Sequence, residues 1–319
     1  IPHFRLTSID ATVFDSSRRD EPVLVLAFMG VECPLANLYL PRLNELGQEF
    51  ADRPVTFAVV NSNAHDSLEE VRLQAREHGV KFPVLKDPGQ HVADLFGAER
   101  TPEVFVLDED NTVRYRGRID DQYGYRYRKE TPTRRDLALA LESALAGRQV
   151  EQPRTDVEGC HISRRHFKYA DSQYSYYRDA LPILQRRCQR CHREGEIGPF
   201  ALATLEDARD WSETIRETVL AGRMPPWKAD SAYGEFDNVL RLTADEQDLL
   251  VSWIDNGCPA GNPEDAPPSM QWVDGWNISP PDEVFTMPEP FVVPATGIVE
   301  YQYVRVSAGF PEDSWVDAV

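Results

Sequence analysis

The sequence contains no long apolar run. A membrane-spanning helix needs about 20 consecutive apolar residues, whereas the longest apolar stretch here, Val23 to Met29, has the length of a buried strand. We therefore expect no membrane span in this chain. Ile1 is not an initiator methionine and no basic-then-apolar leader precedes it, so we expect that a signal peptide or anchor was removed or lies outside this numbering.

Basic residues and cysteines are also scarce. Lys and Arg number 34 against 53 Asp and Glu, which gives a net charge of −19. Such a charge repels nucleic acid and anionic lipid and favours basic partners, although solubility accounts for it equally well. Five cysteines in 319 residues are too few for a disulfide-framework fold. They are Cys33, Cys160, Cys188, Cys191 and Cys258.

The first 150 residues alternate strand and helix patterns. Apolar stretches bounded by turn residues alternate with stretches of helical periodicity, which predicts a layered α/β domain. The strands are expected at Glu21 to Met29, Val55 to Val60, Val104 to Leu107 and Thr112 to Arg116, and the helices at Leu35 to Phe50, Ser67 to His78 and Arg134 to Leu145. Residues 151–173 have little periodicity and carry Cys160. We interpret them as a linker that wraps back over the first domain.

The remainder of the chain changes character twice. Residues 174–265 show only helical patterns, and Thr243 with Glu246 forms a capping box for the last helix, which Gly257 ends. This predicts an all-α domain. Residues 266–319 begin with a Pro-rich link and then alternate in the manner of strands between Phe291 and Val306. We expect a short β-rich segment that starts a third domain.

A C-x-x-C-H motif lies in the helical region, as Cys188-Gln189-Arg190-Cys191-His192. In this pattern two thiolates add to the haem vinyl groups, and the adjacent imidazole is placed under the iron. A zinc site would need two more ligands, and in this half only Cys258 remains, with no second C-x-x-C and no H-x-x-x-H. The motif therefore predicts one covalently attached haem c, with His192 as an axial ligand.

The second axial ligand is expected to be a methionine, because no histidine follows His192. Met224 lies in the segment Arg223-Met224-Pro225-Pro226-Trp227, where two prolines restrict the backbone and Trp227 is expected to cover the haem edge. Met270 and Met287 are weaker candidates, and Met224 as ordinary core filler stays open. His/Met ligation would raise the potential and suit an electron carrier.

The region around this motif resembles the small single-haem cytochrome c domains of large multidomain periplasmic proteins of bacteria. Pro182-Ile183-Leu184, the C-x-x-C-H, Gly198-Pro199-Phe200, the Met-Pro-Pro-Trp segment and Trp253 followed by Gly257-Cys258-Pro259-Ala260-Gly261 carry the resemblance. It implies Cys188 and Cys191 as attachment sites, with His192 and Met224 on the iron. Cys258 is then expected to serve in packing, with a disulfide as the second possibility.

Residues 1–150 resemble thioredoxin-like redoxin domains of the AhpC/TSA type, since a strand, a loop cysteine and a helix are followed by Thr101-Pro102 before a strand. The resemblance implies a cis Pro102 against the cysteine loop. The usual C-x-x-C is here Cys33-Pro34-Leu35-Ala36, so the second thiol of that loop is absent. Gly30 and Leu26 replace the threonine and proline of peroxiredoxins, which argues against peroxide reduction.

Cys33 is left with three alternatives. It is expected at a helix N-terminus, which lowers a thiol pKa, and Cys160 on the linker lies within reach. The two residues form a structural disulfide, or a redox-active pair, or they are unpaired thiols or part of a metal site that adds His161.

The C-terminal end also carries a resemblance. Pro280-Pro281-Asp282, Met287-Pro288, Pro294-Ala295-Thr296-Gly297 and Tyr301 are similar to the entry into copper type II, ascorbate-dependent monooxygenase-like domains. No histidine follows His192, so no monooxygenase activity is expected of these residues.

Three functions remain open. The leading hypothesis is a periplasmic electron-transfer protein that carries haem c and meets basic redox partners or a membrane-bound electron-transfer complex. A second is an accessory subunit on the periplasmic face of a respiratory or photosynthetic complex. A third is a thiol-disulfide oxidoreductase that uses Cys33 and Cys160.

Overall fold

The computed structural model describes residues 1–164, 173–227, 239–272, 281–292 and 301–307, together with 229, 234, 236, 309, 312 and 315. The chain divides into two compact units, Ile1–Pro267 and Pro268–Val319. None of the helices in the described ranges is long and apolar enough to cross a membrane.

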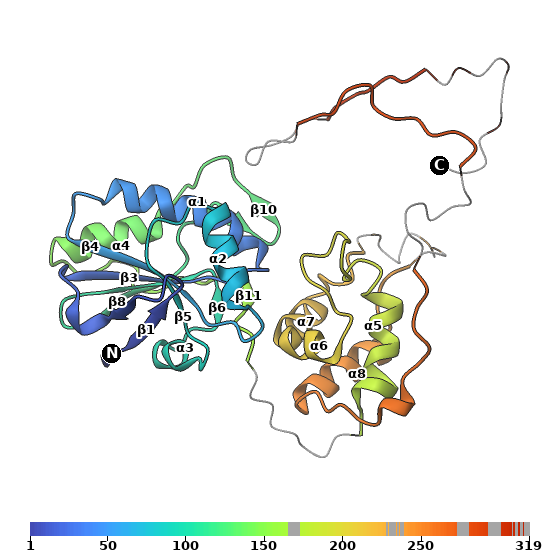
Figure 1. The fold of residues 1–319 in the computed structure, drawn as a ribbon, viewed down its shortest axis with the longest axis horizontal. Helices are drawn as coiled ribbons and strands as arrows, with labels where there is room; N and C mark the ends of the chain where they lie inside the picture. The colour runs from blue at the N-terminus through green and yellow to red at the C-terminus, as the bar shows by residue number, and fades with distance from the viewer. Residues whose placement is uncertain are drawn as a thin grey trace. The chain divides into compact units, whose positions relative to one another are not determined.

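A seven-stranded sheet is the centre of the N-terminal domain, with strands in the order β2-β1-β5-β4-β3-β7-β8 (Figure 1). The strands are β1 Arg5–Ser8, β2 Val13–Asp15, β3 Val23–Phe28, β4 Val55–Asn61, β5 Val84–Lys86, β7 Glu103–Leu107 and β8 Val113–Gly117. Strands β3, β4 and β5 are parallel, whereas β7 pairs antiparallel with both β3 and β8. The predicted α/β architecture of this domain is confirmed.

Four helices cover the two faces of the sheet. They are α1 Pro34–Glu49, α2 Leu68–Glu77, α3 His91–Phe96 and α4 Asp136–Leu145. Side chains alternate along a strand, so Val23 and Val25 of β3 pack in one core with α1, α2 and α4, while Leu24 and Leu26 pack in the other core with α3. Figure 1 shows α1 and α4 on one side of the sheet and α3 on the other.

The segment after α4 returns along this domain. Thr155 N donates to Arg116 O at 3.1 Å, and Ile162 N donates to Glu99 O at 2.8 Å. Between these contacts β11, Cys160–His161, pairs antiparallel with β6, Arg100–Thr101. A separate two-stranded ladder joins β9 Tyr123–Gly124 to β10 Tyr127–Arg128.

Every regular element described between residues 173 and 272 is helical. A π-helical turn, Tyr176–Ala180, precedes α5 Leu181–Arg187, and α6 Leu205–Asp210, α7 Ser212–Leu220 and α8 Ala244–Asp255 follow. These helices surround Trp253, which is fully buried. The predicted capping box of α8 is confirmed, because Glu246 N donates to Thr243 Oγ1 at 3.1 Å and Thr243 N donates to the Glu246 carboxylate at 3.0 Å.

The prediction of a β-rich C-terminal segment is wrong for the residues that can be described. Residues 281–292 and 301–307 contain no strand, and Tyr301 and Tyr303 are about nine-tenths exposed. Alternation of apolar residues suits a strand only where a neighbouring strand accepts its backbone hydrogen bonds. Residues 293–300, which carry the rest of that pattern, lie outside the described residues.

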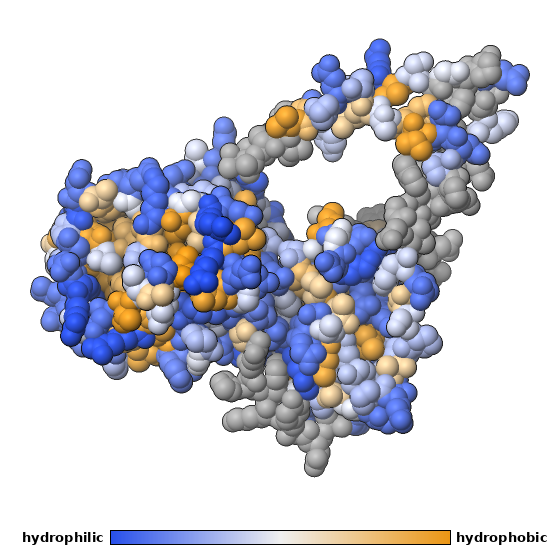
Figure 2. Space-filling view, viewed as in Figure 1, coloured by the Kyte–Doolittle hydropathy of each residue, from blue (hydrophilic) through white to orange (hydrophobic). Residues whose placement is uncertain are grey.

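Hydrophilic side chains are frequent on the visible face of the N-terminal domain, where apolar groups are interspersed among them (Figure 2). This mixture agrees with a chain that holds 53 acidic and 34 basic residues.

Candidate functional site

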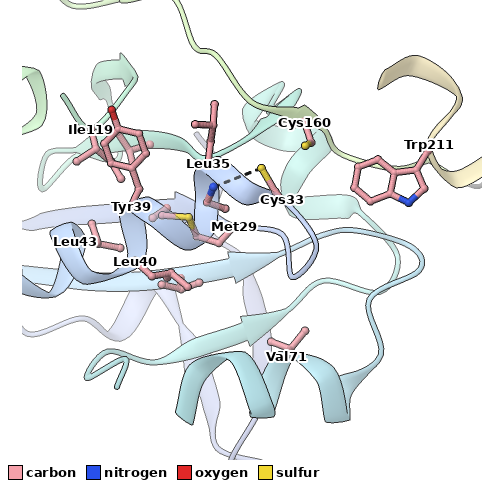
Figure 3. Packing of buried hydrophobic residues seen from close by; sticks show 14 of the residues in the cluster. Met29, Cys33, Leu35, Tyr39, Leu40, Leu43, Val71, Ile119, Cys160 and Trp211 are labelled. Carbon is pink, nitrogen blue, oxygen red and sulfur yellow. Dashed lines mark hydrogen bonds between the residues drawn. The ribbon is translucent and has the colours of Figure 1, made fainter. Parts of the chain in front are cut away.

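Cys33 and Cys160 come together beside the end of β3. Cys33 is the N-cap residue of α1, and Pro34 at the first helical position fixes the start of that helix. Cys160 lies opposite Thr101 in the β6–β11 ladder. Thr101 precedes Pro102, and the peptide bond between them is cis, as predicted. Neither cysteine forms a disulfide in this structure, and the two side chains lie in one buried cluster (Figure 3).

The electrostatics of the two thiols differ. Burial raises the pKa of Cys33, but hydrogen bonds from Cys160 and Thr101 to the thiolate, together with the Ala36 amide at 3.5 Å, lower that pKa to about 6. The hydrogen bond to Cys33 raises the pKa of Cys160 well above its usual value, and burial adds to this. Cys33 is therefore the thiol that ionises more readily, whereas Cys160 keeps its proton.

Thr101 contributes two different groups to Cys33. As a thiol, Cys33 Sγ donates to the Thr101 carbonyl oxygen at 2.9 Å. The Thr101 hydroxyl is buried and has no hydrogen-bond partner other than Cys33 among the residues that the structure describes. Ionisation of Cys33 supplies an acceptor for this hydroxyl, so the thiolate satisfies a polar atom that the thiol leaves unpaired.

We predict that Thr101→Val raises the pKa of Cys33, because valine keeps the shape of the side chain and removes the donor. Thiolate absorbance at 240 nm, recorded against pH, should titrate near pH 6 in the unmodified protein. The midpoint should move up by about one unit in the variant, since one hydrogen bond to a charged group is worth roughly 1.5–3 kcal/mol. Cys33→Ser should abolish this step, and an unchanged midpoint in Thr101→Val would contradict the assignment.

Gly159 allows β11 to approach β6 closely enough for Cys160 to reach Cys33. No pattern in the sequence predicts this role of Gly159. A Cβ at Gly159 would lie 2.1 Å from the Thr101 carbonyl oxygen, and its φ of +154° is one that other residues rarely adopt. Arg100 Nη1 donates to Gly159 O at 2.9 Å, and Gly159 N donates to Tyr125 Oη at 2.9 Å. These contacts hold the backbone at the position from which Cys160 meets Cys33.

We predict that Gly159→Ala prevents the two cysteines from forming a disulfide, although it alters neither of them. The added methyl group must push β11 away from β6. Gly147→Ala is the matched control, because Gly147 also has a positive φ, of +64°, but a Cβ added there would meet no atom within 4 Å. Free thiols counted after mild oxidation should be higher by two in Gly159→Ala only, whereas equal counts in both variants would contradict the role of Gly159.

The C-x-x-C-H residues form a turn at the end of α5. Cys191 N and His192 N donate to the Cys188 carbonyl oxygen at 3.0 and 2.9 Å. The His192 Nδ1 atom lies 3.0 Å from the Phe200 carbonyl oxygen, so Nδ1 carries the proton and Nε2 keeps its lone pair for a metal. Burial lowers the pKa of His192, which favours the neutral ring that a metal ligand requires. These residues fit the attachment of a c-type haem.

Met224 and Trp227 are not brought to His192 by any contact among the described residues. Met224 is 41% exposed, and its N donates to Thr218 O at 3.2 Å. Trp227 packs edge-on against Phe236, with ring centroids 5.7 Å apart. The described residues contain no group of three or more His, Cys, Asp or Glu side chains arranged around a metal position. The roles of Met224 and Trp227 stay predictions.

Cys258 packs in the helical core. It is fully buried next to Trp253, and its thiol is unbonded. Burial raises the pKa of Cys258 to about 12, so its thiol stays protonated and unreactive.

The helical part contributes Trp211 and Glu217 to the neighbourhood of the thiols, and sequence reasoning missed both. Trp211, between α6 and α7, lies in the same buried cluster as Cys33 and Cys160 (Figure 3). Glu217 on α7 accepts hydrogen bonds from Arg100 and from His161, which are neighbours of Thr101 and Cys160. Contacts between residues more than 50 positions apart leave no local pattern in the sequence.

Comparisons with known proteins find relatives of the N-terminal domain. The AhpC/TSA family matches residues 1–116. The thiol-disulfide oxidoreductase ResA of Bacillus thuringiensis is 25% identical over 112 residues, which are 35% of this chain and 64% of ResA. The thioredoxin-like protein YneN of Bacillus subtilis is 25% identical over 136 residues, which are 43% of this chain and 76% of YneN.

A hypothetical protein of Sinorhizobium meliloti has a similar crystal structure, at 29% identity, with 50% of this chain and 90% of that chain covered and a TM-score of 0.47. The chain spans about 64% of the length of ResA. The sequence similarity to ResA supports a thioredoxin-like redox role for the N-terminal domain, and it does not extend over the whole of either protein. The N-terminal part of this chain is a thioredoxin-like domain of the AhpC/TSA type.

Proposed function

We propose that the N-terminal domain catalyses thiol-disulfide exchange with Cys33 and Cys160 as its redox pair. The observation that carries this proposal is the meeting of the two thiols beside cis Pro102, with pKa shifts in opposite directions. Cys160 replaces the thiol that the loop Cys33-Pro34-Leu35-Ala36 lacks. Relatives named thiol-disulfide oxidoreductases agree with this reading.

The chemistry proceeds in two displacements. The Cys33 thiolate attacks a substrate disulfide, so a Cys33–substrate bond forms and one substrate thiolate leaves and takes up a proton. Cys160 then loses its proton and attacks Cys33 Sγ, which releases the second substrate thiol and joins Cys33 to Cys160. The substrate gains two electrons, and the pair loses them. A dithiol of another protein returns the pair to its reduced state.

We predict that Cys33→Ser abolishes reduction of a model disulfide, whereas Cys160→Ser stops the cycle after the first displacement. A mixed disulfide with the substrate should accumulate only in Cys160→Ser, because the resolving thiol is missing. Mass spectrometry of the quenched reaction detects this adduct. Cys258→Ala is the control and should keep full turnover, since that thiol is fully buried and burial raises its pKa. Full turnover in Cys33→Ser would refute the proposal.

A second proposal concerns the helical domain, which we infer carries one haem c on Cys188 and Cys191 with His192 as a ligand. The hydrogen bond from His192 Nδ1 to Phe200 O favours it, because it leaves Nε2 available. When bound, the haem supplies a one-electron redox centre. Met224 is proposed as the second ligand and Trp227 as the cover of the haem edge.

We predict that Cys188→Ala with Cys191→Ala removes covalently bound haem in a pyridine haemochrome assay. Met224→Leu should keep the haem but lose the weak far-red band of methionine-to-iron ligation in the oxidised protein. Met270→Leu is the control and should keep that band. Retention of the band in Met224→Leu would exclude Met224, and a preparation without haem would exclude the second proposal altogether.

Both proposals suit an extracytoplasmic location, where disulfides persist and a covalent haem is expected. The net charge of −19 favours basic redox partners or a basic surface of a membrane-bound complex. An accessory role in such a complex is compatible with either activity. The resemblance of the C-terminal residues to a copper type II monooxygenase-like domain stays a prediction, and we propose no monooxygenase activity for this chain.

A further inference from the structure

The proposed redox pair is almost completely covered. Cys33 is 1% exposed and Cys160 is 8% exposed. A thiolate that exchanges with a disulfide of another protein must be reached by that disulfide, and reactive cysteines are partly exposed for this reason. The groups that cover the pair therefore control whether a disulfide of another protein can reach Cys33.

Trp211 of the helical domain lies beside the pair (Figure 3). It is 3% exposed and lies in the buried cluster that contains both cysteines (Figure 3). Its ring packs on His65, with centroids 5.1 Å apart, and His65 Nδ1 lies 2.9 Å from Ser163 Oγ. The indole thus packs on the loop after β4, and that loop is in turn hydrogen-bonded to the segment that follows Cys160.

Glu217 fastens α7 to the two strands that carry the site. Arg100 of β6 donates to Glu217 at 2.6 Å, and the His161 ring of β11 lies 2.8 Å from the same carboxylate oxygen. His161 N also donates to Thr214 Oγ1 at 3.2 Å. Burial raises the pKa of Glu217, but Arg223 and Arg100 lower it to about 2, so the carboxylate is charged at neutral pH.

We propose that α6 and α7 form a lid over the Cys33–Cys160 pair, closed by Trp211 and fastened by Glu217, which must open before Cys33 reacts with a disulfide of another protein. This inference rests on the exchange activity proposed above. The closed lid keeps the Cys33 thiolate from macromolecular disulfides, and the open lid exposes it.

The lid contact is of a kind that opens reversibly. The ion pair of Arg100 with Glu217 is only partly buried, since the two side chains keep 22% and 28% of their exposure. Water therefore reaches these groups and can replace their hydrogen bonds when the contact opens. Domains of one chain move relative to one another unless the contact between them is large and apolar. Trp211 contributes an apolar contact and Glu217 a polar one, so the loss of either should favour opening.

The test measures access to Cys33 in the reduced, full-length protein. A maleimide attached to a polymer of about 5 kDa reports whether a bulky partner can reach Cys33. Iodoacetamide reports whether a small molecule can reach it. Mass spectrometry of the Cys33 peptide separates its labelling from that of other cysteines. Thiolate absorbance at 240 nm, unchanged among the variants, shows that the pair itself is intact.

Glu217→Gln and Trp211→Ala should each accelerate labelling of Cys33 by the polymer maleimide at least about tenfold, equivalent to a shift of 1.4 kcal/mol in the opening equilibrium, with a smaller change for iodoacetamide. Arg216→Gln is the matched control. Arg216 is the neighbour of Glu217 on α7 and pairs at 2.6 Å with Asp255 inside the helical domain, so its loss leaves the lid fastened.

Equal labelling rates in the unmodified protein, Glu217→Gln and Trp211→Ala would overturn the lid. Acceleration by Arg216→Gln to the same degree would also overturn it, because the effect would then be a general loosening of α7. Labelling does not require turnover. Failure of the exchange activity in every variant, with the expected labelling pattern intact, would refute the proposed activity and leave the lid in place.

Discussion

The pairing of β11 with β6 is the contact on which the candidate site depends. It spans only Cys160–His161 and Arg100–Thr101, yet it brings a cysteine from beyond the α/β domain to the N-terminus of α1. A thioredoxin-like fold supplies the first thiol at a helix N-terminus, where backbone amides favour the thiolate. The loop then has no second thiol, and the returning segment supplies one from the side of the cis proline.

This arrangement accounts for the lowered pKa of Cys33 despite its burial. A buried thiolate is unfavourable unless donors surround it. Here the donors come from three separate segments: Ala36 in α1, Thr101 in β6 and Cys160 in β11. Loss of the β6–β11 ladder would remove two of the three, so the geometry of the returning segment sets the chemistry of the loop as well as the distance between the thiols.

The local parts of this picture could be predicted from the sequence. The apolar runs of β3 and β4, helical spacing after Pro34 and the capping box at Thr243 are short-range signals, and the structure confirms those elements. The segment after α4 has no periodicity, so its return over the first domain could be proposed from the sequence, but its pairing with β6 could not. The requirement for Gly159, by contrast, arises from a carbonyl oxygen nearly 60 residues earlier in the chain.

Two further features depended on distant contacts and were missed or mistaken. Trp211 and Glu217 come near the thiols because α7 packs against β11 and Glu217 accepts hydrogen bonds from Arg100 and His161. The expected C-terminal strands fail for a related reason. Alternating residues such as Tyr301 and Tyr303 specify a strand only when a partner is present, and the described residues of that segment are exposed.

One chain of aromatic rings makes the two candidate sites continuous. His192 packs on Phe200 with centroids 4.7 Å apart, Phe200 stacks on Trp211 at 3.7 Å and an interplanar angle of 6°, and Trp211 lies beside the thiol pair (Figure 3). Stacked rings in a close-packed interior have little room to shift independently. The proposed haem ligand and the proposed lid are therefore joined by one stack of rings.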